Sequence, residues 1–104
     1  MLSVVIVSWN TQQLLAGCLA SIETHPPGAP YEVWVVDNAS ADGSPAMVRQ
    51  RFPSVRLIEN QDNVGFAAAS NQAVKEIQSE YALLLNPDTE VRPGALDALV
   101  AFME

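Results

Sequence analysis

The tripeptide Asn86-Pro87-Asp88 is the part of the sequence best suited to chemistry, because it presents a carboxylate directly after the apolar run at 83–85. Such a carboxylate can hold Mg²⁺ or Mn²⁺, with phosphate oxygens and water completing the coordination shell. Taken alone, the tripeptide is more typical of a type I turn that binds nothing. We predict that Asp88 is a metal ligand if other polar groups gather beside it.

Polar residues also follow the other apolar runs of the sequence, at 8–10, 37–38 and 60–65. Turn chemistry alone places Asn and Asp at such positions, so a set of plain turns is the alternative. Their recurrence after every apolar run favours a shared binding edge. The residues that we predict to bind a ligand at this edge are Ser8, Trp9, Asn10, Asp37, Asn63, Gly65 and Asn86.

Three of these residues suit a nucleotide. Asp37 follows the second apolar run, where it can accept N–H bonds from a base edge, bind a ribose hydroxyl or cap a helix. The ring of Trp9 can lie against a base or pack against a helix. Gly65 permits close approach of the backbone to a ligand, and the helix that should follow it favours phosphate at its N-terminus.

Hydrophobic periodicity predicts the elements that position these residues. Apolar and β-branched runs predict strands at 4–7, 32–36, 55–58 and 81–85. They alternate with helices expected from about 11 to the prolines at 26–27, at 45–52, at 66–78 and from 93 onward. Helical spacing predicts inward-facing side chains at Leu14, Phe66, Val74 and Leu99.

Strands that alternate with helices form a parallel sheet covered on both faces. We therefore predict an α/β fold with a doubly wound, mostly parallel sheet in the order 3-2-1-4, a Rossmann-like half-domain. Ligands of such sheets bind outside the carboxyl ends of the strands, where the strand order reverses. That point lies between strands one and four, which brings Asn10 and Asp88 to opposite sides of one crevice.

Charge and composition narrow the classes of partner. The chain has 104 residues and a formal net charge of -7, and its five Lys and Arg residues form no dense block. We therefore expect no nucleic-acid partner, and an anionic ligand here needs a metal ion, backbone N–H groups or a helix N-terminus. The chain has a single cysteine, Cys18, and no signal-like segment. Both features predict a cytoplasmic location, which includes attachment to the inner face of the membrane.

Four segments in this order resemble the signature of the family-2 glycosyltransferases, inverting enzymes with the GT-A fold. The segments are 4–10, 35–40, 63–71 and 83–88, so the resemblance spans nearly the whole chain. It implies nucleotide contacts for Ser8, Asn10 and Asp37, and donor contacts for Asn63, Gly65 and Asn71. It also implies that the turn at 86–88 binds the metal and the donor sugar phosphate.

Two departures from the family pattern qualify the resemblance. Asn86 stands where the family's Asp-x-Asp turn has its first acid, which leaves Asp88 as the metal ligand. This variant is similar to rhamnosyltransferases of cell-surface polysaccharide synthesis, and implies a dTDP-, UDP- or GDP-linked sugar donor and a saccharide or lipid-linked acceptor. Family members are longer, so we expect 1–104 to be the N-terminal nucleotide-sugar-binding part of a truncated GT-A domain. Its catalytic base should lie beyond residue 104, which makes this segment alone inactive in transfer.

Other interpretations of the sequence stay open. A nucleotidyltransferase-like domain uses a similar fold, but it usually carries a glycine-rich basic loop after the first strand, and residues 8–13 have neither feature. A non-catalytic nucleotide-binding or assembly module is the second alternative. If the domain is truncated after its fourth strand, that strand should form an uncovered sheet edge, which predicts a homodimer or aggregation through that edge.

Overall fold

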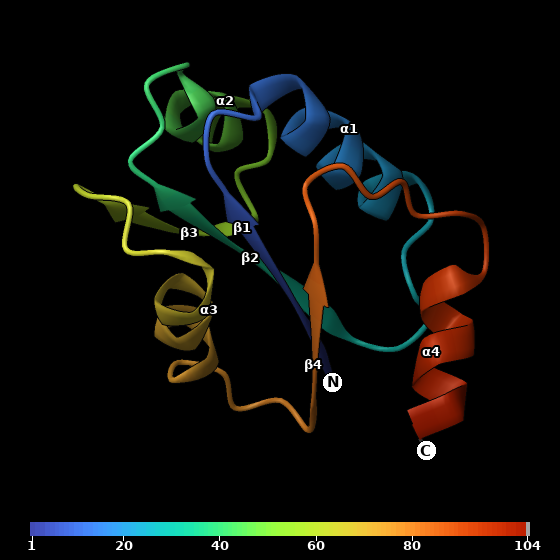
Figure 1. The fold of residues 1–104 in the computed structure, drawn as a ribbon. Coiled ribbons are helices and arrows are strands. Elements are labelled where there is room, and N and C mark those ends of the chain that lie inside the picture. The colour runs from blue at the N-terminus through green and yellow to red at the C-terminus, as the bar shows by residue number, and fades with distance from the viewer. Residues whose placement is uncertain (104) are drawn as a thin grey trace.

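Strands and helices alternate along the chain in the computed structural model, which describes residues 1–103 (Figure 1). The elements are β1 (Leu2–Ser8), α1 (Gln12–Thr24), β2 (Tyr31–Asn38), α2 (Ser44–Arg51), β3 (Arg56–Asn60), α3 (Phe66–Val74), β4 (Tyr81–Leu85) and α4 (Ala95–Met103). The strands pair in parallel in the order β3-β2-β1-β4. The predicted α/β fold and strand order are therefore confirmed.

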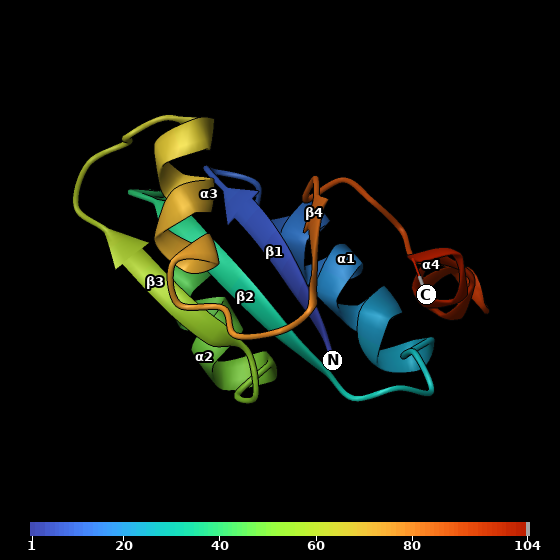
Figure 2. The ribbon, with the colours of Figure 1, turned by 90° about the horizontal axis from the view of Figure 1, so that it is seen from below.

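The sheet is covered on both faces, with α3 on one side and α1, α2 and α4 on the other (Figure 2). Alternate side chains of a strand point to opposite faces. Val4 and Ile6 accordingly join the cluster that contains Leu15 and Leu19 of α1, while Val5 faces α3. Because β1 is buried on both faces, its residues from Val4 to Val7 are all apolar rather than alternating with polar ones.

Four side chains predicted to face inward are exposed instead. The exposed fractions are 53% for Leu14, 55% for Phe66, 44% for Val74 and 38% for Leu99. Helix α3 contacts the sheet through small side chains, chiefly Ala69 and Ala73, so its buried stripe is narrower than the apolar pattern suggested. The helix also ends at Val74 rather than near 78.

Helix α4 packs beside α1 and β4 through Leu96 and Val100. Two hydrogen bonds fix its ends, because Asp97 accepts the N–H of Gly28 at 2.6 Å and the Tyr81 hydroxyl donates to the carbonyl of Met103 at 3.3 Å. Among residues 1–103, no helix combines the length and apolar character that a membrane span requires.

Candidate functional site

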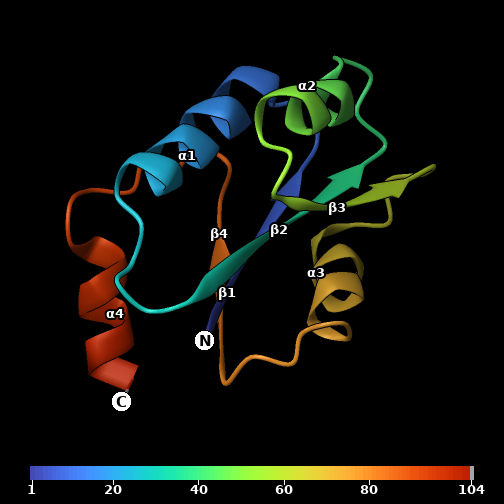
Figure 3. The same cartoon turned by 180° about the vertical axis from the view of Figure 1, so that it is seen from behind.

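The loops that follow β1 and β2 are connected by hydrogen bonds at the carboxyl edge of the sheet, the edge at which the strand arrows of Figures 1 and 3 end. The N–H of Asn10 donates to Ser40 Oγ at 2.9 Å, and the N–H of Ala41 donates to Asn10 Oδ1 at 2.7 Å. Asn10 has a φ of 52°, a left-handed conformation that Asn tolerates better than most residues. The Asn10 amide oxygen therefore fixes one loop to the other.

Asp42 provides a second connection between these loops, and sequence reasoning missed it. Its Oδ2 accepts the N–H of Gln12 at 2.9 Å at the start of α1, and its Oδ1 accepts the N–H of Ser44 at 3.1 Å at the start of α2. Burial alone would raise the pKa of Asp42, but the hydrogen bonds from Ser44 and Gln12 prevail and lower it. The acid two residues before Ser44 was the available signal in the sequence.

Asp37 lies at the end of β2 and is only 1% exposed. Its Oδ2 accepts the N–H of Ser40 at 2.9 Å, whereas its Oδ1 has no hydrogen-bond partner within residues 1–103. Ser8 stands opposite Asp37 in the parallel register and shares a hydrogen bond of 3.0 Å with the Thr11 hydroxyl. A buried carboxylate oxygen without a donor is costly, so this oxygen suits a ligand N–H or O–H.

Trp9 directly follows the buried Ser8 and is 55% exposed. Its ring is not part of either apolar cluster of the fold. The alternative interpretation of the sequence, in which the Trp9 ring packs against a helix, is therefore not supported by the structure. An exposed ring next to the end of β1 is suited to stacking on a base.

The turn at the end of β4 borders a hollow of about 270 Å³ lined by Thr11, Leu14, Asn86, Pro87 and Asp88. The N–H of Thr89 donates to the carbonyl of Asn86 at 3.0 Å, which closes the predicted turn. Asp88 is exposed, and Leu14 owes its own exposure to its place on this hollow. The ends of β1 and β4 therefore meet here, as the strand order predicts.

The side chains at this turn can coordinate a divalent ion only if a bound ligand supplies further oxygen atoms. Within the described part of the chain, no three His, Cys, Asp or Glu side chains gather as a complete metal site. Asp88 supplies one carboxylate, and Asn86 beside it supplies a neutral amide. Mg²⁺ in particular binds through one or two carboxylates together with substrate phosphates and water, so the residues present fit an ion delivered with a diphosphate.

Cys18 lies beneath the turn and is 1% exposed. Burial, with a smaller contribution from the negative charge of Asp88, raises the pKa of its thiol to about 11. The thiolate is the nucleophilic form of cysteine, so Cys18 is inert at neutral pH. Its contribution is packing and a long hydrogen bond to the carbonyl of Asn86 at 3.9 Å.

A chain of amides ties the loop before α3 to the end of β2. Asn38 Nδ2 donates to the carbonyl of Gly65 at 3.1 Å, and Asn38 Oδ1 accepts from Asn60 Nδ2 at 3.1 Å. Asn60 in turn exchanges two hydrogen bonds with Gln72, at 2.8 and 3.0 Å. The sequence offered no signal for Gln72, because its partner is twelve residues away and in another element.

The three predicted donor residues on this side of the sheet divide between edge and helix. Asn63 Oδ1 accepts the N–H of Gly65 at 2.9 Å, so both residues belong to the loop fastened to β2. Asn71 lies farther along α3 and is exposed. The structure therefore brings Asn63 and Gly65 to the carboxyl edge, whereas Asn71 lies on the surface of the helix.

Gly65 is required for its backbone conformation, with φ 85° and ψ 170°. A Cβ at this position would meet nothing within 4 Å, so strain and not space decides the effect of substitution. We expect Gly65→Ala to lower the free energy of unfolding by about 1–3 kcal/mol. Gly17→Ala is the matched control, because Gly17 lies inside α1 with similar free space and should gain roughly 1 kcal/mol. Urea unfolding of both variants checks this, and a Gly65→Ala chain as stable as the parent would contradict it.

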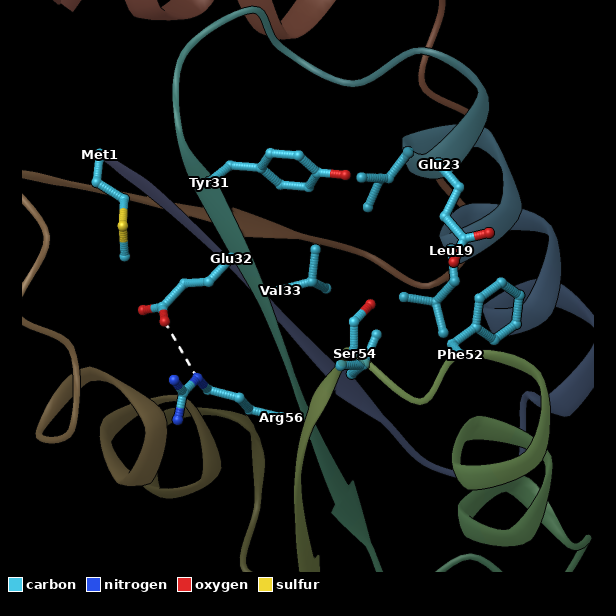
Figure 4. Close-up of a pocket in the computed structure, with 11 residues that line it drawn as sticks. Met1, Leu19, Glu23, Tyr31, Glu32, Val33, Phe52, Ser54 and Arg56 are labelled. Atoms are coloured by element: carbon cyan, nitrogen blue, oxygen red, sulfur yellow. Dashed lines mark ion pairs between the residues drawn. The ribbon is translucent and has the colours of Figure 1, made fainter.

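A cavity of about 450 Å³ lies at the opposite end of the sheet (Figure 4). Tyr31, Glu32 and Val33 at the start of β2 line it together with Phe52 and Arg56. The charged pair in its lining is already satisfied, because Glu32 accepts from Arg56 Nε at 3.2 Å and from Ser3 Oγ at 2.7 Å. The cavity therefore offers less to a polar ligand than the carboxyl edge with its unpartnered Asp37 oxygen.

Comparison with known proteins agrees with this geometry. The family model described as glycosyl transferase family 2 matches residues 3–104. The N-acetylglucosaminyl-diphospho-decaprenol L-rhamnosyltransferase of Mycobacterium tuberculosis is 31% identical over 95% of this chain and 36% of its own length. The succinoglycan biosynthesis protein ExoO of Rhizobium meliloti is 31% identical over 92% of this chain and 28% of its own length.

A solved structure shows the same arrangement of elements. The mannosyltransferase PcManGT from Pyrobaculum calidifontis, in complex with GDP-Man and Mn²⁺, superposes with a TM-score of 0.89 at 28% identity. The superposition covers 98% of this chain and 32% of that one, so the chain spans about a third of the length of such relatives. With a family model matched from residue 3 to residue 104, the chain belongs to glycosyl transferase family 2.

Proposed function

We propose that residues 1–104 form the donor-binding part of a GT-A glycosyltransferase that transfers a sugar from a nucleotide diphosphate to an acceptor hydroxyl with inversion. One observation carries the proposal: the unpartnered Oδ1 of buried Asp37 and the exposed carboxylate of Asp88 both lie at the carboxyl edge of the sheet. That edge is where open α/β sheets bind nucleotides.

Each group at the edge has a distinct task in this proposal. Asp88 would hold Mg²⁺ or Mn²⁺, which would supply positive charge to neutralise the diphosphate leaving group. Asp37 accepts a hydrogen bond from an N–H of the base or a hydroxyl of the ribose, and the ring of Trp9 covers the base. Asn86 adds an amide beside the phosphates without adding charge. The Mn²⁺ in the mannosyltransferase complex supports the metal assignment.

Asp37 also favours a pyrimidine base. One of its oxygens already accepts from Ser40, so a single acceptor oxygen is free for the ligand. Uracil and thymine present one imide N–H on their pairing edge, whereas guanine presents an N–H and an amino group side by side. We therefore propose UDP- or dTDP-linked donors before GDP-linked ones, although the mannosyltransferase relative was solved with GDP-Man.

The relatives suggest the rest of the reaction. The mycobacterial relative is named for rhamnosyl transfer to a lipid-linked sugar, and the rhizobial one for succinoglycan biosynthesis. We propose a rhamnosyl or hexosyl donor and a saccharide or lipid-linked acceptor in cell-surface polysaccharide synthesis. The free, buried Cys18 fits a reducing compartment such as the cytoplasm, and a lipid-linked acceptor would place the domain at the inner face of the membrane.

Titration calorimetry with UDP, dTDP and GDP, each with and without Mn²⁺, tests the proposal directly. We expect binding that strengthens when Mn²⁺ is added and that is tighter for the two pyrimidine nucleotides than for GDP. Metal-independent binding would contradict the role of Asp88. Absence of binding to all three nucleotides would favour the alternative of an assembly module.

The edge of β4 supports a second proposal, self-association of the chain. The edge strand β4 carries no charged side chain and leaves Leu84 48% exposed, whereas the other edge strand, β3, carries Arg56 and Glu59. Charges on an edge strand oppose strand-to-strand pairing, so β4 is the edge open to a second copy. We expect dimers by light scattering at high concentration and monomers for Leu84→Lys. Leu99→Lys on α4 is the control, and a strictly monomeric parent chain would contradict the proposal.

A further inference from the structure

The loop between β4 and α4 carries Asp88 and passes along α1 before it reaches α4 (Figures 1 and 3). Two groups of α1 hold this loop. The N–H of Val91 donates to Ser21 Oγ at 2.8 Å, and Cys18 Sγ donates to the carbonyl of Asn86 at 3.9 Å. Both ends of the segment 86–91 are therefore fastened to one face of the same helix.

The Ser21 hydroxyl is the stronger of the two fastenings. It donates its only proton to the carbonyl of Cys18 at 2.7 Å, which orients its lone pairs toward the N–H of Val91. The thiol is a weak donor and its bond is long. The Val91 side chain is 5% exposed and belongs to the main apolar cluster, so its backbone N–H has little access to water as a substitute partner.

Helix α1 connects this fastening to the candidate site. Its first turn reaches the hollow beside Asp88 through Leu14, and Asp42 holds the N–H of Gln12 at the start of the helix. A second hollow, of about 380 Å³, runs between α1 and the loop and is lined by Gly17, Ser21 and Asp88 among others. Because this hollow separates part of the loop from α1, the hydrogen bonds at Ser21 and Cys18 are the polar contacts that hold the loop at its distance from the helix.

We propose that Ser21 is a positioning residue for Asp88: its hydroxyl fixes the loop that carries the metal turn against α1, three residues beyond Asp88. This inference rests on the proposed function, because it concerns the ligand of the proposed ion. Ser21 acts through the backbone at Val91 and touches neither the ion nor the nucleotide. Its loss should therefore weaken binding of the ion and leave metal-free nucleotide binding as it is.

Three single variants test the inference. Ser21→Ala removes the hydroxyl, and Ser21→Thr keeps it. Thr24→Ala is the matched control, because the Thr24 hydroxyl donates to the carbonyl of Ala20 at 2.8 Å on the same helix. Hydrogen exchange at the Val91 amide measures whether its hydrogen bond to Ser21 is present. Titration of Mn²⁺ at a fixed concentration of UDP measures whether that hydrogen bond affects binding of the ion.

For Ser21→Ala we expect exchange at Val91 to quicken about tenfold or more and the apparent Mn²⁺ affinity to fall roughly five- to tenfold. Ser21→Thr and Thr24→Ala should resemble the parent chain in both measurements. Unchanged Mn²⁺ affinity in Ser21→Ala, or an equal loss in Thr24→Ala, overturns the inference.

The exchange experiment separates this inference from the function on which it rests. A parent chain without Mn²⁺-dependent UDP binding overturns the proposed function, whatever Ser21 does. In that case slow Val91 exchange that quickens only in Ser21→Ala still supports Ser21 as the fastening of the loop. Exchange that is equal in all variants overturns that role too.

Discussion

Asp88→Asn is expected to remove the effect of Mn²⁺ on nucleotide binding and to reduce affinity in the presence of Mn²⁺ to its metal-free value. The affinity for UDP in the presence of Mn²⁺ should fall about 10- to 100-fold or more, because removal of a group that merely supports a metal ligand already costs that much. Among residues 1–103, Asp88 is the one carboxylate that lines the hollow at the end of β4, and its neighbour Asn86 carries no charge. The amide of the variant keeps the size of the side chain, so the change isolates the charge. Calorimetry with UDP, with and without Mn²⁺, measures it.

Glu90→Gln is the control for that experiment. Glu90 is exposed, lies two residues beyond Asp88 and lines the neighbouring hollow against α1. It lies outside the hollow that Asn86 and Asp88 share with Thr11, so its variant should keep affinity within about twofold, a change of less than 1 kcal/mol. Equal losses in the two variants would mean that general negative charge attracts the ion and that Asp88 is no specific ligand.

The carboxyl edge could be predicted from the sequence because it follows from local patterns. Continuous β-branched runs mark strands buried on both faces, and the alternation of strands with helices leaves few sheet orders. Each run ends at a polar residue, so Ser8, Asp37 and Asn86 had to lie at one edge once the strands were parallel. The structure confirms the strand order.

The contacts that shape the site could not be predicted in the same way, because they join residues that are far apart in sequence. Asp42 reaches Gln12 over thirty positions, and Ser21 reaches Val91 over seventy. Periodicity assigns a residue to a face but does not say whether a neighbour covers that face. Leu14 shows the limit, because it has the helical spacing of a core residue and lies on the hollow beside Asp88.

Asp37→Asn should weaken nucleotide binding and leave the unliganded fold as stable as before, or more stable. In the parent chain one carboxylate oxygen is held by Ser40, and the other is buried with no donor among residues 1–103. Asparagine keeps an oxygen for Ser40 and replaces the unpartnered oxygen with an amino group, which relieves a buried charge. A base that offers an N–H would then meet another donor. Loss of a charged hydrogen bond of about 1.5–3 kcal/mol corresponds to roughly a 10- to 150-fold drop in affinity.

Asp37→Asn should lower the affinity for the nucleotide without lowering the stability of the fold, and this combination makes the experiment decisive. If Asp37 only capped the turn through Ser40, the variant would bind UDP like the parent chain, because its remaining oxygen preserves that bond. If the carboxylate were essential to the fold, urea unfolding would show a clear loss of stability. Asp62→Asn, in the exposed loop after β3, is the control for removal of one charge and should change neither measurement. Weaker UDP binding together with retained stability is the combination that only a ligand-facing carboxylate produces.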